Sequence, residues 1–217
     1  MRGRLLAMLL LSIPLGMPGA GPPGVQANQA IALIVKARQN RTEGYFYRAE
    51  AQYRRALAIV EQTFGAGSAN LIPALNGLSE LDFEARRYTE AEALSRRSAA
   101  LVEATLGAGH PLMATALHDL AAIYHVQGQY AKAEPLYYRA LAIRENTLGP
   151  GHPFVAATLA NLAAMERAQG RRGRAAEHYA RAVRISQGAL ERDGQRFADA
   201  WRCAAPGASV AQTEALQ

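Results

Sequence analysis

Apolar residues recur at helical spacing in the middle of the chain. A first set falls on one face of a helix: Leu117, Leu120, Ala121 and Tyr124. A second set does the same further along: Ala133, Leu136, Tyr137, Ala140, Leu141 and Ile143. Gly128 lies between the two sets and tolerates the left-handed backbone with which a helix often ends. The pattern predicts a helical hairpin whose small residues let the two helices approach closely.

The hairpin pattern returns at a fixed interval along the chain. The linker Leu-Gly-Ala-Gly-His-Pro at 106–111 is matched by Leu-Gly-Pro-Gly-His-Pro at 148–153, which gives a 42-residue period. The closing proline suits the first turn of the next helix. The register predicts repeats at about 28–64, 69–106, 111–148 and 153–190. One hairpin cannot bury both of its faces, so the repeats must stack into an all-α solenoid of about four hairpins within 28–204.

The last copy of the repeat is incomplete. Phe197 and Trp201 are spaced at i and i+4, so a helix would place them on one face, and Trp201 corresponds to Leu159 in the 42-residue register. The sequence therefore predicts a separate C-terminal capping helix at 195–204 that covers the exposed flank of the last hairpin. The alternative is that Trp201 is a binding aromatic. Residues 205–217 are small and polar, and we expect a disordered tail.

Residues 1–27 are predicted to be a cleavable signal peptide. A short cationic start precedes an apolar run at 5–15, which is too short to span a bilayer as a helix. Cleavage is expected after Ala20 or Ala27, and Ala27 better fits the small-x-small pattern. We therefore expect export to a bacterial periplasm or secretion, with no stable membrane insertion after cleavage. The alternative is a retained signal that anchors the same domain at the membrane.

Composition adds exclusions to this picture. Of the 217 residues, 50% are hydrophobic, 19% charged and 7% aromatic, which suits one packed domain. The 24 Lys and Arg residues against 18 Asp and Glu residues give a formal charge of +6, but they form no long basic block. No nucleic-acid partner is therefore predicted. Cys203 is the only cysteine, which excludes an internal disulfide and a cysteine-based zinc site.

The repeat resembles the tetratricopeptide repeat family. The order of large and small residues is similar to that family's signature: Leu117, Leu120, Ala121, Tyr124, Ala133, Tyr137 and Ala140. The 42-residue period, the His-Pro linker and the phrase Gly-Gln-Tyr-Ala-Lys-Ala-Glu-Pro-Leu-Tyr-Tyr-Arg-Ala-Leu-Ala-Ile at 128–143 resemble the longer repeats of the kinesin light chain type. Other copies depart from the signature at Lys36, Asp82, Ser95 and Glu166. The resemblance implies a right-handed α-solenoid whose concave groove binds a peptide or a partner protein.

The resemblance also implies which side chains line that groove. They are the positions on the first helix of each repeat that packing does not use. The candidate binding residues are Asn76, Glu80, Phe83, Thr115, His118, Asp119, His125, Asn161 and Arg167, with Glu84, Ala122, Ala157, Ala160 and Ala164 beside them. Asp119 and Asn161 occupy the slot where the kinesin light chain type carries a pair of asparagines. An amide there can both donate to and accept from a peptide backbone.

No catalytic or metal-binding pattern accompanies the repeat. His118 and His125 share a helix face but stand ~10 Å apart along its axis, too far to hold one ion together. The chain has no Gly-x-Ser-x-Gly, Gly-x-x-x-x-Gly-Lys or His-Glu-x-x-His sequence. We therefore predict no enzyme activity, no metal and no cofactor. The favoured function is an exported adaptor that binds a partner in the groove, and the alternative is a structural or assembly protein that self-associates through repeat ends or the convex face.

Overall fold

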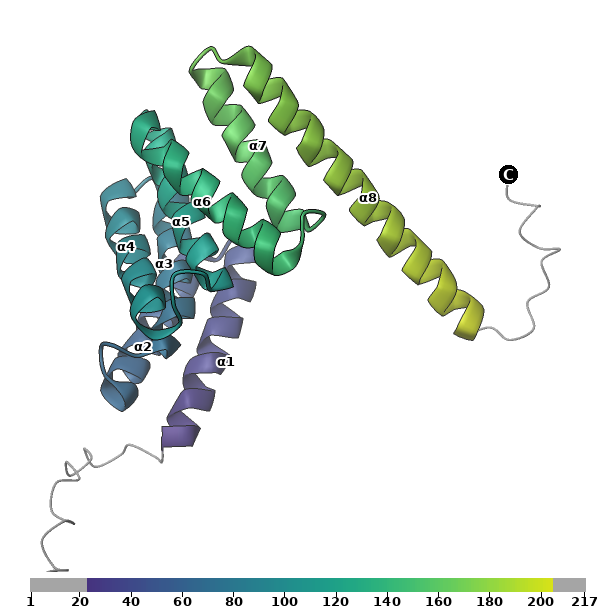
Figure 1. The fold of residues 1–217 in the computed structure, drawn as a ribbon. Coiled ribbons are helices and arrows are strands. Elements are labelled where there is room, and N and C mark those ends of the chain that lie inside the picture. Colours follow the sequence, from purple (N-terminus) through teal and green to yellow (C-terminus); the bar gives the residue numbers. More distant parts are fainter. Residues whose placement is uncertain (1–22, 205–217) are drawn as a thin grey trace, which may run out of the picture. The chain divides into compact units, whose positions relative to one another are not determined.

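The computed structural model describes residues 23–204, with side chains as far as Arg192, and this part of the chain contains helices and no strands (Figure 1). The helices are α1 (Pro23–Thr42), α2 (Phe46–Phe64), the short 3-10 helix η1 (Ala69–Leu71), α3 (Ile72–Glu84), α4 (Tyr88–Thr105), α5 (Pro111–Val126), α6 (Tyr130–Leu148), α7 (Pro153–Ala168) and α8 (Arg172–Ala204). The all-α prediction is confirmed. Most of the predicted signal peptide, and the whole of the predicted tail, lie outside the described residues.

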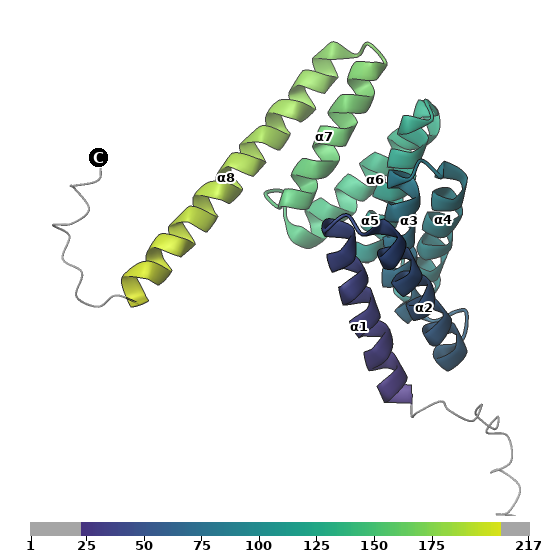
Figure 2. The same ribbon diagram turned by 180° about the vertical axis from the view of Figure 1, so that it is seen from behind.

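The chain divides after Leu81 into two compact units. The first contains α1, α2 and most of α3, and α1 and α2 form a helical pair (Figure 2). Tyr53 of α2 is fully buried within it. Gly77 of α3 lies so close that a Cβ built on it would be 2.8 Å from Cε2 of the Tyr53 ring and nearer still to Cε1 and Cζ. Position 77 therefore accepts only glycine without a shift of the ring or the helix.

The second unit contains α4 and two hairpins, α5 with α6 and α7 with α8. The linkers before α5 and α7 start these helices in the same way. His110 and His152 accept hydrogen bonds at Nδ1 from the backbone N–H groups of Leu112 (3.2 Å) and Phe154 (3.1 Å), and proline follows each histidine. A side-chain acceptor satisfies one of the unpaired N–H groups of a helix start, and proline adds a preset φ. The predicted helix starts at Pro111 and Pro153 are confirmed.

A buried cluster joins the two hairpins of the second unit. Its members are Leu120, Ala121, Tyr124, Ala133, Tyr137, Leu141, Val155, Ala156, Leu159, Leu162, Met165 and Ala182. Tyr137 of α6 is fully buried among them, in one cluster with Val155 and Leu159 of α7. Ala121 and Ala133, also fully buried, let α5 and α6 come close enough for the larger side chains to interlock. The apolar periodicity of the sequence thus predicted the core correctly.

The separate capping helix predicted at 195–204 is absent, because α8 runs without a break from Arg172 to Ala204. At the corresponding point of the preceding repeat, α6 ends at Leu148 and Gly149 adopts a φ of 87° before Pro153 starts α7. In the 42-residue register, Glu191 replaces Gly149 and Gln195 replaces Pro153. Glutamate and glutamine favour a helix, so both stop signals are lost.

The last turns of α8 extend beyond α7. The Arg192 guanidinium donates a hydrogen bond to the carbonyl oxygen of Gly151, just before α7 begins, at 3.2 Å. The helix then continues to Ala204, past the start of its partner, in both views (Figures 1 and 2). Among the described residues, no helix is long and apolar enough to cross a membrane.

Candidate functional site

The predicted binding residues fall into both units. In the first unit, Asn76 is largely buried in α3, and Glu80 forms an ion pair with Arg41 at 2.8 Å. In the second unit, the ring of Phe83 meets Tyr88 edge-on, with 5.8 Å between ring centroids. The other candidates lie on α5 and α7: Thr115, His118, Asp119, His125, Asn161 and Arg167.

His118 and Asn161, predicted as independent groove residues, contact each other. Asn161 Nδ2 lies 3.0 Å from His118 Nε2. On its other side, His118 Nδ1 lies 3.3 Å from Nη1 of Arg144, which projects from α6. The ring also packs edge-on against Tyr137, at 5.5 Å between centroids. His118 is therefore a linking residue between three helices.

Arg144 is the centre of this polar cluster, and it was not among the predicted site residues. The side chain is buried, with 6% of the residue's surface exposed. Its Nη1 donates to Thr158 Oγ1 at 2.6 Å and to the Phe154 carbonyl at 3.1 Å. The signal was present in the sequence, because Arg144 follows Tyr137, Ala140 and Leu141 on the apolar face of α6. A charged residue on such a face requires buried partners.

The arginine determines which nitrogen of His118 carries the proton. A guanidinium can only donate, so Nδ1 must present its lone pair to Arg144, and the neutral ring carries its hydrogen on Nε2. Two N–H donors cannot bond each other. The contact with Asn161 is therefore satisfied when the amide turns its oxygen toward Nε2 and its NH2 group away from the histidine.

Burial controls the protonation of the cluster. Burial, and secondly the Arg144 charge, lower the pKa of His118 to about 3, so the ring is neutral at pH 7. Burial also lowers the pKa of Arg144, and the Asp119 carboxylate opposes that shift. The pKa of Tyr137 is raised by burial and by Asp119. Asp119 thus acts as the countercharge of a buried arginine, a role that its predicted place in the groove did not anticipate.

His125 lies two helix turns further along α5 than His118. Its ring contacts Tyr130 and Tyr137, with centroids 5.9 and 6.4 Å apart, and burial lowers its pKa. Groups of three or more His, Cys, Asp or Glu side chains able to hold a metal ion do not occur in the part of the chain that the structure describes.

Polar residues at the signature's aromatic position have local partners. Tyr124 donates to Glu92 Oε1 at 2.7 Å and accepts from Arg96 at 2.6 Å. Its counterpart Glu166 is fully buried and lies 2.8 Å from His178 Nδ1. In the same way, the Asp82 carboxylate accepts from Arg87 Nε at 2.7 Å. These substitutions keep the helix packed because each replaces one aromatic contact by a paired polar group.

The tetratricopeptide repeat family matches residues 74–146 and, in an overlapping second match, residues 112–188. Together the two matches span more than half of the chain. The chain belongs to the tetratricopeptide repeat family. The resemblance inferred from the repeat register is therefore confirmed. Tetratricopeptide repeats are in general non-enzymatic and mediate protein–protein interactions as adaptors or scaffolds.

Solved structures share the fold. BtubC (BKLC) from P. vanneervenii has a TM-score of 0.68 at 22% identity, over 79% of this chain and 67% of that one. The kinesin light chain TPR-like repeats of Podosopora anserina have a TM-score of 0.65 at 24% identity, over 76% and 78%. Aspartyl phosphate phosphatase F from Bacillus subtilis has a TM-score of 0.66 at 18% identity, over 76% and 42%. No curated protein sequence matches the chain.

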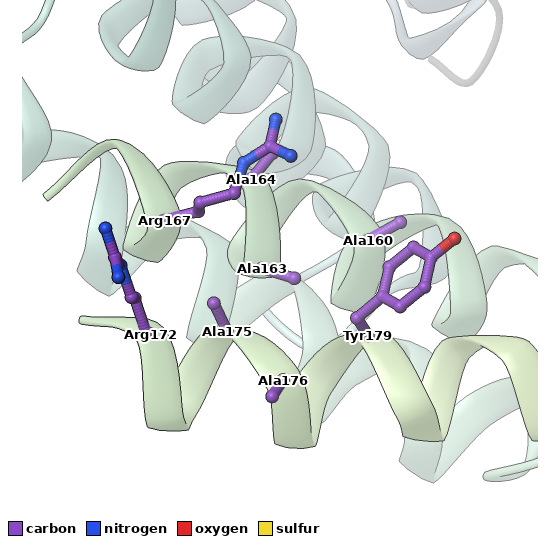
Figure 3. Close-up of a pocket in the computed structure, with 8 residues that line it drawn as sticks. All are labelled: Ala160, Ala163, Ala164, Arg167, Arg172, Ala175, Ala176 and Tyr179. Atoms are coloured by element: carbon purple, nitrogen blue, oxygen red, sulfur yellow. The ribbon is translucent and has the colours of Figure 1, made fainter. Parts of the chain in front are cut away.

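An apolar pocket of about 430 Å³ lies between α7 and α8 (Figure 3). Its lining residues are Ala160, Ala163, Ala164, Arg167, Arg172, Ala175, Ala176 and Tyr179. The two arginines lie at one end and the Tyr179 ring at the other. Arg167, Ala160 and Ala164 are predicted groove residues, whereas Ala163 and the α8 side of the pocket were not predicted to line a groove.

Proposed function

We propose that this tetratricopeptide protein is an exported adaptor that holds a segment of a partner protein against its α5–α7 face. We define this face as the partly exposed Thr115, Asp119, Ala122, Asn161 and Ala164 together with the exposed Ala157. The observation that carries the proposal is the contact of Asn161 with His118, because it holds a hydrogen-bonding amide at a fixed position on this face.

The chemistry of the face suits a peptide backbone. The NH2 group of Asn161, turned away from His118, can donate to a peptide carbonyl. Ala122, Ala157 and Ala164 leave room for a backbone to approach, and Arg167 at the end of α7 can meet an acidic side chain. The face has no cluster of lysines and arginines of the kind that grips a terminal carboxylate. An internal segment in extended or helical form is the ligand this surface fits.

A photo-crosslinking amino acid at position 157 tests whether the face binds a partner in cells. Ala157 is exposed, so a bulky side chain can be introduced there, whereas His118 is largely buried. Position 139 is exposed on α6 and serves as the matched control. We expect a discrete adduct from position 157 alone, identified by mass spectrometry. Equal adducts from both positions, or none from 157, would contradict groove binding.

The Asn161→Ala variant is expected to weaken binding of the captured segment about three- to tenfold, the effect of one lost hydrogen bond. A synthetic peptide with the crosslinked sequence, titrated by calorimetry, measures the change. Arg139→Ala should leave the affinity unchanged. Affinity equal to that of the unmodified chain in Asn161→Ala would mean that the amide only supports the helix packing.

Export is the second part of the proposal, and it rests on the cationic and apolar residues at the start of the sequence. Cleavage after Ala20 would keep the whole of α1, which begins at Pro23. Cleavage after Ala27 would remove Gln26, which accepts a hydrogen bond from Thr63, but would keep the buried Ala30, Ile34 and Ala37. We expect the intact mass of the cell-derived protein to correspond to one of these two starts. A membrane-bound form that retains Met1 would exclude cleavage.

A further inference from the structure

Within residues 23–204, no helix covers the last hairpin in the way that α7 covers the preceding one. Tyr137 of α6 is fully buried, while Tyr179, its counterpart in α8 in the 42-residue register, is 62% exposed. The reason is the neighbouring helix: α7 packs on the α5–α6 hairpin, and its Val155 and Leu159 share a buried cluster with Tyr137. The pocket beside Tyr179 is thus the place where the first helix of a following repeat would lie.

The chain carries the residues of that missing helix. In the 42-residue register, Phe197 stands where α7 has Val155, and Trp201 stands where it has Leu159. Both counterparts in α7 are fully buried. A segment with large apolar residues at these two positions has the pattern needed to cover Tyr179 and the alanines of the pocket.

The same segment cannot reach the pocket of its own chain while α8 is intact. Loss of the glycine and proline stop signals at 191 and 195 keeps the helix continuous to Ala204. The part of α8 that follows Arg192 adds roughly 18 Å of helix beyond the start of α7. It therefore points away from the α7–α8 pocket along the axis of α8 (Figure 1).

We propose that two copies of the chain exchange these segments, so that residues 195–204 of each copy cover the α7–α8 pocket of the other. The exchange is symmetric, and each copy supplies one pocket and one covering helix. The replacement of a flexible linker by a continuous helix is the kind of change that converts a contact within one chain into a contact between two. The pocket shares Ala164 and Arg167 with the surface proposed for the partner segment, whereas Asn161 does not line it. The exchange specifies a surface for self-association.

Sedimentation equilibrium of the full chain tests the exchange. We expect a concentration-dependent dimer, and a chain that ends after Arg192 is expected to be monomeric with its hairpins intact by circular dichroism. Trp201→Ala should weaken dimerisation at least about tenfold, as expected for a buried aromatic anchor. Asn161→Ala, on the α5–α7 face, is the control and should dimerise normally. A full chain that stays monomeric up to about 100 µM would overturn the proposal.

Mixing two defective variants distinguishes exchange from other modes of association. Ala176→Glu places a charge in the pocket at an exposed position, and Phe197→Glu with Trp201→Glu places charges on the covering segment. Each variant alone should be monomeric. Their mixture should recover a heterodimer, because one intact pocket and one intact segment remain. No recovery would overturn the exchange.

Restoring the lost linker provides a third test. Glu191→Gly combined with Gln195→Pro reintroduces the stop signals of the preceding repeat, so the segment can fold back onto its own pocket. We expect this variant to be a monomer in which the fluorescence of Trp201, the only tryptophan, stays blue-shifted. If it remains a dimer, the association does not depend on the continuous helix and the proposal is wrong.

Discussion

Replacing Gly77 with alanine is expected to lower the free energy of unfolding of the first unit by about 2 kcal/mol, the difference between an overpacking cost and a gain in helix propensity. The added Cβ would overlap three carbons of the Tyr53 ring. The ring is fully buried, so overpacking should cost about 3 kcal/mol, the upper part of its usual range. The higher helix propensity of alanine returns about 1 kcal/mol. Urea denaturation and hydrogen exchange in α2 and α3 measure the loss.

Two variants make this expectation specific. Gly173→Ala in α8 adds a Cβ that meets no atom within 4 Å, so it should be neutral or slightly stabilising. Tyr53→Leu removes the ring carbons that Cβ would strike, and Gly77→Ala should then cost less in that background than in the unmodified chain. If the cost of Gly77→Ala is the same in both backgrounds, the close approach of ring and helix is not the cause.

The repeat register predicted the fold well because its signals are local. A histidine that caps the helix start, followed by proline, determines where α5 and α7 begin, whatever the rest of the chain does. The prediction failed at α8 for the same reason. Phe197 and Trp201 still follow the apolar register of the repeat, but Glu191 and Gln195 no longer interrupt the helix. The apolar register and the stop signals are separate properties of a repeat, and here only the first persists.

The candidate site was predicted less completely, because it depends on contacts between helices. Helical periodicity placed His118 and Asn161 on the side of α5 and α7 that the core does not use. It could not show that Arg144, two helix turns along α6 from Tyr137, reaches His118 and Thr158. A period within one helix carries no information about which side chain of the next helix meets it. His118 was predicted to contact a ligand, but its contacts with Arg144 and Asn161 make it part of the packing between α5, α6 and α7.

Acidification from pH 7 to pH 5 is expected to lower the free energy of unfolding by about 2 kcal/mol through His118 alone. The pKa of His118 is about 3 in the folded protein, against 6.5 for an exposed histidine ring. Between these values the unfolded chain binds a proton that the folded chain excludes. The contribution is thus fully present above pH 6.5, falls by about 1.4 kcal/mol for each pH unit below it, and levels off near the folded pKa.

The His118→Gln variant separates this contribution from those of other groups. Glutamine does not titrate, and it can still accept from Arg144. Its free energy of unfolding, measured in urea at pH 7, 6 and 5, should show a slope smaller than that of the unmodified chain by about 1 kcal/mol per pH unit. His110→Asn keeps a helix cap and should retain the original slope. An unchanged slope in His118→Gln would mean that the folded protein protonates His118 beside Arg144, which the burial of both side chains opposes.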